Sequence, residues 1–532
     1  MRRKLYGGKH PSEFLDIFFG DDAFTNGSVP GSCWNNDVKS SFQNVTKPEI
    51  INDGTEIPPS ESVMGKRLAI AIRKCIDTKA FEYIDTHSHL DVNENVPKTG
   101  ADGTLYAKSS LCPSANKPDS TFLESTTEIK RSDAAALVFQ DDPNKGFEEK
   151  TTNSTNIRGQ LAAYAVAPLM FQHRNHFFTV FIRGSTARLI RWDRAGAIVT
   201  EEFNYGQESY LADFYWRFTH ATAKARGHDT TVRRLSDTKD HDLVCLVRGK
   251  LDPLGLKVKE PVFEIKVWDD TPETVNEGLP YYSLNPFVNH AHSVTGRATR
   301  VFRVWDPRMK KVVALKDCWR VNSSSILPEG HAYEILKENH VRNIPTCLRA
   351  GDVDPGCAYQ RTQTQDVLSS ARTTRSHIHY RIVLEEVCIG NITGFEDTKE
   401  LVSVLRDSLI AHTDAYTKAG ILHRDVSAGN ILITEDRRGL LGDWELSKLV
   451  VDLSTARQPQ RTGTWQFISA ALLQLHRPCH SLKDDLESFV HVFSWTCLKH
   501  VKNMMMPSQL GEHLSSTTKS YSIALQIRCS EE

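Results

Sequence analysis

Residues 420–433 carry the most specific chemical pattern in the sequence, GILHRDVSAGNILI. His423, Arg424 and Asp425 stand together, and Asn430 follows Asp425 by five residues. Phosphoryl transfer uses a carboxylate close to the accepting hydroxyl and an amide oxygen, five residues further on, that helps to hold a metal ion. The apolar residues on both sides predict a loop between a helix and a short hairpin. This pattern favours phosphoryl-transfer chemistry.

A second carboxylate lies at the spacing that this chemistry requires. Asp443, in GLLGDWELSK, comes eighteen residues after Asp425. It matches the metal-binding aspartate of the D-F-G element, with Trp444 in the aromatic position. Glu445 stands where glycine is usual. The spacing predicts that Asp443, like Asn430, is a metal ligand.

Upstream, residues 313–316 read V-A-L-K, which predicts a strand lysine that binds the nucleotide phosphates and a helix glutamate. The candidate glutamates are Glu329 and Glu334, and we prefer Glu334 because it lies inside the predicted helix of residues 328–340. A glycine-rich phosphate loop should precede Lys316 by one hairpin. Only Gly296, in TGRATRVF, stands there, so the loop is degenerate.

These motifs, together with RTGTWQFISAALL (461–473) and DDLESFVHVF (484–493), closely resemble the fungal-type protein kinase domain family. The resemblance covers roughly residues 115–500 and implies a two-lobed kinase fold that binds ATP and Mg²⁺. It implies that Lys316 binds the phosphates, that Asp425 is the catalytic base and that Asn430 and Asp443 bind the metal ion. Asp485 would be a buried carboxylate that braces the catalytic loop.

Arg424 in the H-R-D motif distinguishes two kinds of kinase, because small-molecule kinases often carry glycine there. The arginine predicts a protein kinase in which a phosphate on the activation segment, at Ser454 or Thr455, pairs with Arg424. Ser427 stands where most serine/threonine kinases carry lysine.

The elements that must position these residues suggest an α+β chain. Residues 1–65 are rich in turn-forming residues and are expected to be weakly ordered. Residues 66–285 are expected to form an α+β domain, 286–500 the kinase-like domain, and 501–532 a tail that leaves the C-terminal lobe short. Strands are predicted around 177–183 and 187–203, with a hairpin turn at residues 193–196. The aromatic segment 208–218 is interpreted as core.

The N-terminal half contains two further motifs of interest. DTHSHLD (85–91) resembles the metal-binding H-x-H of amidohydrolase-type enzymes, although the barrel that should follow is missing. Asp119, Glu128 and Lys130 fit a PD…(D/E)-x-K nuclease pattern, in which carboxylates hold Mg²⁺ and the lysine steadies the attacking water. Gln160 opens a predicted helix, as in many such folds. A nuclease-like fold is therefore one interpretation of this domain, and a packing scaffold is the other.

Composition limits the function classes. The chain has 532 residues, 65 Lys+Arg and 66 Asp+Glu, so its net charge of -1 points to neither nucleic acid nor an anionic membrane as a partner. No apolar stretch is long enough to span a membrane, and no secretory signal is recognisable. The eleven cysteines contain no C-x-x-C pair, which favours reduced thiols in the cytoplasm or nucleus.

The main prediction is an ATP-dependent protein kinase acting on a protein hydroxyl. The alternatives are a pseudokinase scaffold and a nuclease-like domain fused to an inactive kinase. The sequence identifies neither the protein substrate nor the oligomeric state.

Overall fold

The computed structural model describes residues 4–52, 54–87, 89–91, 100–108, 118–132, 137–142, 144–255, 260–269, 278–284, 293–323, 326–354, 360–368, 374–452, 463–473 and 479–501. The chain forms two compact units. Unit 1 comprises Met1–Arg233, Val288–Arg300 and Ala358–His379. Unit 2 comprises Arg234–Phe287, Val301–Cys357 and Tyr380–Glu532. The sequence suggested one boundary near residue 285, whereas the chain passes between the two units repeatedly.

Unit 1 is built around a mixed sheet with the order β1-β9-β8-β7-β6-β5-β4, and β10 pairs with β8. The strands are β1 (Leu5–Lys9), β4 (Phe81–Asp85), β5 (Gly103–Ala107), β6 (Leu123–Lys130), β7 (Phe177–Arg183), β8 (Thr186–Asp193), β9 (Gly196–Thr200) and β10 (Phe203–Asn204). Strands β4, β5 and β6 are antiparallel neighbours, whereas β6 and β7 run parallel because helix α4 connects them.

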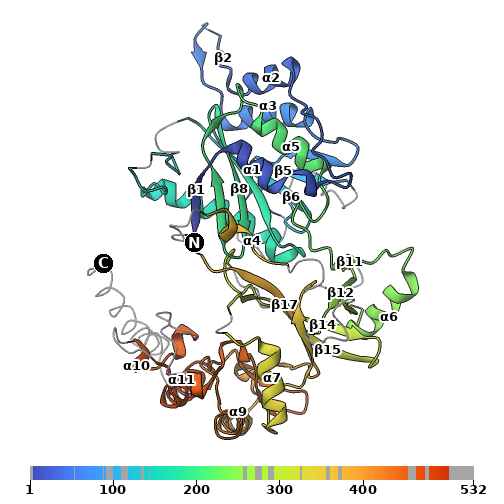
Figure 1. The fold of residues 1–532 in the computed structure, drawn as a ribbon, viewed down its shortest axis with the longest axis vertical. Coiled ribbons are helices and arrows are strands. Elements are labelled where there is room, and N and C mark those ends of the chain that lie inside the picture. Colours follow the sequence, from blue (N-terminus) through green and yellow to red (C-terminus); the bar gives the residue numbers. More distant parts are fainter. Residues whose placement is uncertain are drawn as a thin grey trace. The chain divides into compact units, whose positions relative to one another are not determined.

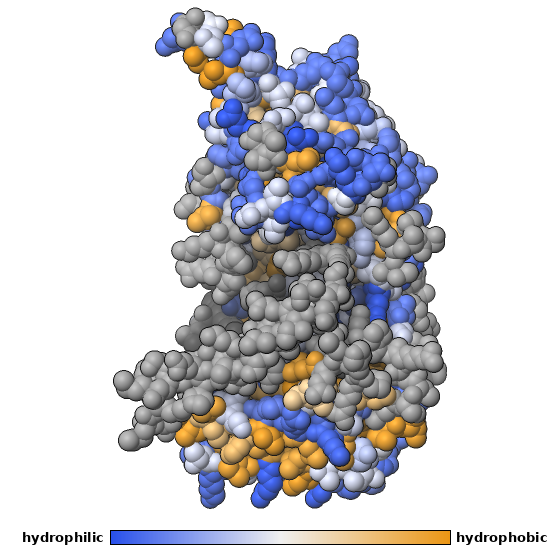
Figure 2. Space-filling model, turned by 90° about the vertical axis from the view of Figure 1, so that its left-hand side faces the viewer, coloured by the Kyte–Doolittle hydropathy of each residue, from blue (hydrophilic) through white to orange (hydrophobic). Residues whose placement is uncertain are grey.

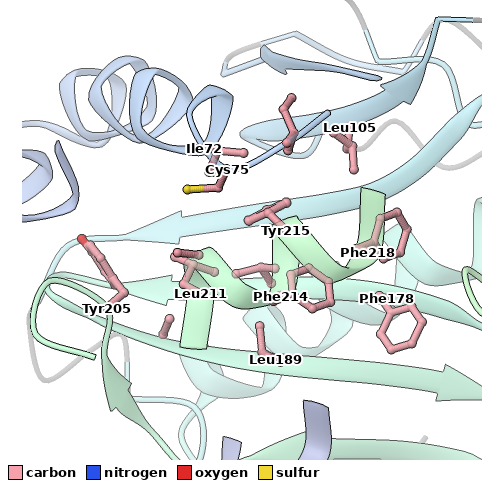
Figure 3. Packing of buried hydrophobic residues seen from close by; sticks show 14 of the residues in the cluster. Ile72, Cys75, Leu105, Phe178, Leu189, Tyr205, Leu211, Phe214, Tyr215 and Phe218 are labelled. Atoms are coloured by element: carbon pink, nitrogen blue, oxygen red, sulfur yellow. The ribbon is translucent and has the colours of Figure 1, made fainter. Parts of the chain in front are cut away.

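Helices cover both faces of this sheet (Figure 1). On one face pack α1 (Pro11–Phe18), α2 (Asn36–Gln43), α3 (Glu61–Arg73) and α5 (Tyr210–His220). On the other packs α4 (Thr152–Phe171). Strand β7 serves both, since Phe178 faces the α5 side and Phe177 the α4 side, as the alternation of a strand requires. Figure 3 shows Phe214 and Phe218 of α5 packed near Phe178, so the aromatic segment is core, as predicted.

The N-terminal 65 residues are more structured than their composition suggested. Phe14 and Phe42 are fully buried in the unit 1 core. Strand β1 pairs in parallel with β9, almost two hundred residues later in the chain. Helices α1 and α2 have only eight residues each, which is too short to show a clear helical periodicity of apolar residues. The partner of β1 is distant in the sequence. Local patterning therefore could not reveal this order.

The predicted hairpin at residues 193–196 is confirmed, because Asp193 pairs with Gly196 between β8 and β9. Its aspartate also holds a later chain segment in unit 1. The buried Asp193 carboxylate accepts hydrogen bonds from Arg191 and Ala195 nearby, and from the backbone N–H groups of Gln363 and Thr364. The Thr364 hydroxyl donates to it as well, at 2.8 Å. The short helix α8 (Thr364–Val367) is thereby part of unit 1.

Unit 2 contains a sheet with the order β11-β12-β13-β14-β15-β17-β16. Its strands are β11 (Val232–Arg234), β12 (Phe263–Val267), β13 (Leu279–Ser283), β14 (Arg300–Asp306), β15 (Lys311–Val321), β16 (Cys347–Asp352) and β17 (His377–Leu384). Helix α6 (His241–Leu251) packs its apolar residues with those of β13 and β14. Helix α7 (Glu329–Glu338) connects β15 to β16, at the place where the sequence predicted a helix.

The remainder of unit 2 is mainly helical. Helix α9 (Thr398–Lys418) begins at Asp397, whose carboxylate caps the Glu400 N–H, and α11 (Leu482–His500) begins with a capping box of Ser481 and Asp484. The short strand β18 (Gly390–Asn391) precedes α9. Between α9 and α11 lie α10 (Ala470–Leu473) and the short strands β19 (Ile421–Leu422), β20 (Ile431–Ile433), β21 (Gly439–Leu441) and β22 (Lys448–Leu449). One apolar core joins α7, α9, α11 and these strands. The loops that leave β19 and β21 carry the predicted catalytic residues.

None of the helices in the described part of the chain has the length and apolar character needed to cross a membrane. Hydrophilic and hydrophobic residues both occur on the face shown in Figure 2.

Candidate functional site

Lys316 lies in the middle of β15 and is surrounded by carboxylates. Its Nζ donates to Glu329 Oε2 at 2.6 Å and to Asp443 Oδ1 at 2.7 Å, and Glu445 Oε2 is 3.8 Å away. The lysine side chain is only 8% exposed. These acidic neighbours outweigh the effect of burial and hold the pKa of Lys316 above its ordinary value. The lysine is therefore charged, and it is not the solvated strand lysine that V-A-L-K alone could describe.

The helix glutamate beside this lysine is Glu329, and the preference for Glu334 is wrong. Glu329 is the first residue of α7 and is buried, whereas the Glu334 side chain is 64% exposed and pairs with His331. Five residues along a helix correspond to a rotation of about 140° beyond a full turn, so the two glutamates face different directions. The sequence argument preferred the helix interior, but the first residue of the helix is the one that faces the sheet.

The catalytic loop is fixed by hydrogen bonds within its own motif. The buried His423 ring donates from Nε2 to the Gly442 carbonyl at 3.0 Å, and its Nδ1 accepts from the Asp425 N–H at 3.2 Å. Both bonds suit the neutral Nε2–H tautomer, and burial lowers the pKa of His423. Asn430 donates from Nδ2 to the Asp425 carbonyl at 2.8 Å, which closes the loop. His423 is thus a positioning residue for the two functional side chains.

Asp425 itself is held by a residue that the motif search did not assign. The Thr464 N–H and hydroxyl both donate to Asp425 Oδ1, at 2.7 and 2.8 Å. Thr464 belongs to the segment RTGTWQF, which the sequence analysis used only for the family resemblance. One carboxylate oxygen of Asp425, Oδ1, is therefore held in place by two hydrogen bonds.

Asp443 occupies a left-handed backbone position, with φ of 60°, at the start of a short 3₁₀ turn. Asparagine and aspartate tolerate this region better than most residues. Trp444, the aromatic residue of the motif, is buried against the His423 ring and donates from Nε1 to the Leu441 carbonyl. The aromatic residue thus secures the backbone, and the Asp443 carboxylate is directed at Lys316.

Three carboxylates come together at this point. Oxygen atoms of Glu329, Asp443 and Glu445 lie within 4.8 Å of one another, an arrangement that could hold a metal ion. Oxygen ligands are what Mg²⁺ prefers, so the donor set fits that ion. Desolvation and the acidic neighbours raise the pKa of Glu329 to about 7. Glu445, in the glycine position of the motif, adds a charge that the usual pattern lacks.

A buried acidic residue of α11 supports the catalytic loop from behind. Asp485 accepts hydrogen bonds from His412 Nε2, His480 Nε2 and the Arg424 N–H, at 2.8, 2.7 and 3.0 Å. Arg424 is in the left-handed region, with φ of 70°, and its guanidinium donates to the Leu446 carbonyl. The bracing role expected for Asp485 has a geometric basis here, and the two histidines were not anticipated. Ser454 and Thr455 lie outside the described residues.

Replacing Asp485 with alanine should cost at least about 3 kcal/mol of unfolding free energy, because three buried donors would lose their acceptor. The two histidines hold the pKa of Asp485 well below its ordinary value of 3.8. A lowered carboxyl pKa stabilises the folded state above the ordinary value, and this stability is lost as the pH falls. Urea unfolding of wild type and variant at pH 7 and pH 2 measures the difference, which should shrink at pH 2 because that pH lies below the ordinary carboxyl pKa. The exposed Asp436→Ala serves as the control, and an equal loss in both variants would contradict the bracing role.

Gly296, the glycine expected in the phosphate loop, makes its backbone hydrogen bond within unit 1. It belongs to the segment of unit 1 at Val288–Arg300, where its N–H donates to the Arg194 carbonyl at 2.9 Å. Arg194 also donates to the carbonyl of the fully buried Val294. This segment follows β13 and precedes β14, so it has the chain position expected of the loop, but its contacts are made within unit 1. Residues 285–292 of the same connection lie outside the described residues.

The N-terminal motifs are only partly brought together. Asp119 precedes β6 and accepts from the Thr121 N–H and hydroxyl, whereas Glu128 lies at the other end of that strand, about 17 Å further along. Asp119 and Glu128 therefore cannot share an ion, and that assignment is wrong. Gln160 is exposed in the middle of α4 and does not open a helix. Glu128 does pair with Lys130, at 2.6 Å.

The H-x-H motif also has a different setting from the one considered. His87 donates from Nδ1 to Asp102 Oδ1 at 2.9 Å, and the exposed His89 contacts the His87 carbonyl. The strands around it form an open mixed sheet. His87 is therefore tied to an aspartate that the sequence analysis did not select.

Comparison with known proteins agrees with the catalytic motifs. The model of a family described as fungal protein kinase matches residues 119–497, which is well over half of the chain. A comparison with curated proteins gives no match. This match names the same family that the sequence motifs resemble. The chain therefore belongs to the fungal protein kinase family.

Proposed function

We propose that the chain is an ATP-dependent protein kinase that transfers the γ-phosphate of ATP to a protein hydroxyl. The observation that carries this proposal is the convergence of Glu329 and Asp443 on Lys316, beside the loop that holds Asp425 and Asn430. A charged lysine at this place suits the phosphates of a nucleotide.

The roles follow from the contacts of each side chain. Lys316 would bind nucleotide phosphate oxygens, with Glu329 orienting its ammonium group. Asp443 and Asn430 would hold Mg²⁺, which when bound neutralises the charge on the phosphate oxygens. Their backbones are adjacent, since the Gly442 N–H donates to the Asn430 carbonyl at 2.9 Å.

Asp425 would act on the acceptor. Thr464 anchors Oδ1, and Oδ2 takes the proton of the acceptor hydroxyl as its oxygen forms a bond to the γ-phosphorus. The bond between the γ-phosphorus and the bridging oxygen breaks, and ADP leaves. The segment around Thr464 would bind the protein substrate, because this segment contacts the proposed base Asp425.

The test is phosphate transfer from radiolabelled ATP to the chain itself and to generic protein substrates. General-base assistance contributes about 10²–10⁴-fold, so Asp425→Ala should reduce transfer by that factor. The thermal shift caused by Mg·ATP should persist, because Asp425 does not contact Lys316 or Asp443. Asp436→Ala, in the exposed turn between β20 and β21, should transfer phosphate like wild type. Full transfer by Asp425→Ala would overturn the assignment of the base.

A pseudokinase scaffold is the second candidate, and Glu445 is the observation that favours it. The third carboxylate lies 3.8 Å from Lys316 and competes with a nucleotide for that charge. A Mg·ATP thermal shift without any transfer in wild type would support this function over the first. Glu445→Gly would then be expected to restore transfer if the extra carboxylate is the cause.

A further inference from the structure

Polar side chains from three strands of unit 1 gather at one end of the sheet, at β4, β5 and β6. Asp102 directly precedes β5, and the pairing of Gly103 with Thr127 places it beside Glu128 of β6. Lys130 follows Glu128 by two residues and so shares its face of the strand. His87 follows β4 by two residues. Strands β5 and β6 and helix α4 are marked in Figure 1.

Hydrogen bonds join these side chains in two pairs, His87 with Asp102 and Lys130 with Glu128. Asp102 Oδ2 accepts the Ile129 N–H at 2.7 Å, and its Oδ1 accepts from His87. Glu128 Oε1 pairs with Lys130, whereas the buried Glu128 Oε2 has no hydrogen bond of ordinary geometry among the described residues. The Tyr164 hydroxyl, which donates to the Gly100 carbonyl at 2.9 Å, also lies close enough to the Glu128 carboxylate to lower its pKa. The Glu128 side chain is 2% exposed. A buried carboxylate oxygen without a hydrogen bond of ordinary geometry is costly, so this oxygen requires an explanation.

Glu124 of the same strand shows what a structural glutamate looks like here. It is also buried, but Arg174 and His228 both contact its carboxylate, at 3.0 and 2.9 Å. These cations lower the pKa of Glu124. In contrast, burial and the nearby Asp102 raise the pKa of Glu128 to about 7, although Lys130 acts against this. Glu128 therefore lies near a second carboxylate, Asp102, and has one cationic partner, Lys130. Glu124 has two partners that can be cationic, Arg174 and His228.

We propose that Asp102 and Glu128 bind a divalent cation of the Mg²⁺ class, with Glu128 Oε2 as a ligand. Lys130 holds the other oxygen of Glu128, and His87 orients Asp102. Two protein carboxylates completed by water molecules are a common way of binding Mg²⁺. This site is separate from the carboxylates around Lys316, since all its residues belong to unit 1.

The test uses Mn²⁺ as the probe, measured by electron paramagnetic resonance on the full-length protein without nucleotide. Glu128→Gln and Asp102→Asn should each lose one bound Mn²⁺ per chain compared with wild type. Asp119→Asn is the matched control, because this aspartate precedes the same strand but lies at its other end, and it should bind as wild type does. Equal stoichiometry in all four proteins would overturn the proposal.

A second variant distinguishes this site from Mn²⁺ binding at the carboxylates around Lys316. It also distinguishes loss of the site from misfolding. Asp443→Asn leaves unit 1 unchanged, so it should still bind one Mn²⁺, and excess Mn²⁺ should raise its unfolding temperature. Adding Glu128→Gln to that variant should abolish both effects, with circular dichroism checking that the double variant is folded. Absence of bound Mn²⁺ in Asp443→Asn alone would show that the only cation site is the one beside Lys316.

Discussion

Asp443→Asn is expected to abolish measurable phosphate transfer, with a loss of at least about 10³-fold, because charge stabilisation at the phosphoryl group dominates this chemistry. The change removes one negative charge from the ligand set for Mg²⁺ and keeps the size of the side chain. It also keeps a residue that tolerates the left-handed backbone at φ of 60°. Asp443→Ala would add a backbone cost of about 1 kcal/mol at this position. The asparagine variant therefore separates chemistry from stability.

Two measurements check this expectation. Transfer from radiolabelled ATP gives the loss of activity, and thermal shift with ATP at increasing Mg²⁺ gives the metal dependence of nucleotide binding. Wild type should show a shift that grows with Mg²⁺, and Asp443→Asn a shift that does not. Asp436→Asn is the matched control. If Asp443→Asn transfers phosphate normally, this aspartate is not the metal ligand of the reaction.

Lys316→Met is expected to abolish transfer and also to destabilise the protein. The destabilisation is expected because the lysine side chain is buried against Glu329, which is 2% exposed. Removing one partner of a buried ion pair costs about 3–5 kcal/mol, since the remaining charge has no partner. Lys311→Met, at the start of the same strand, is the control, because Lys311 is half exposed and its pair with Glu385 lies at the surface.

The destabilisation should depend on pH in a defined direction. Lys316 lowers the pKa of Glu329, which burial and its acidic neighbours raise from 4.5 to about 7, so losing the lysine raises this pKa further. A carboxyl with a raised pKa binds its proton more tightly in the folded state, and stability falls as the pH rises through that range. Lys316→Met should therefore lose more stability at pH 8 than at pH 6. Denaturant unfolding at both pH values measures this, and a loss independent of pH would contradict it.

The parts of the site that lie in one continuous motif could be predicted from the sequence. His423, Asp425 and Asn430 are close in the chain, and their hydrogen bonds to one another fix the loop locally. Partners from distant elements could not be predicted in the same way. Glu329 depends on the direction in which the first turn of α7 faces, and Thr464 approaches Asp425 from a segment thirty-nine residues away.

The fold shows the same division. Strands β7, β8 and β9 follow one another with a tight turn, so alternation and turn residues were sufficient to predict them. The partnership of Asp102 with Glu128 depends on the register between β5 and β6, which are joined by residues with little pattern. Sequence reasoning therefore selected Asp119, which stands nearer to Glu128 in the chain and further from it in the structure. Nuclease activity of unit 1 stays a prediction.

The interleaved chain path has a consequence for synthesis. Asp193 reaches its full set of donors only when Gln363 and Thr364 are present, and residues 358–379 belong to unit 1. On the ribosome, most of unit 1 is synthesised long before that segment. Gln363 follows Asp193 by 170 residues, which take some tens of seconds to synthesise at the slower rates. During that time the Asp193 carboxylate lacks the hydrogen bonds from Gln363 and Thr364. Unit 1 therefore cannot be completed until two segments of unit 2, Arg234–Phe287 and Val301–Cys357, have also been synthesised. During this interval nascent chains would depend on protection from aggregation, and expression of residues 1–233 alone would leave the same vulnerable intermediate as its end product.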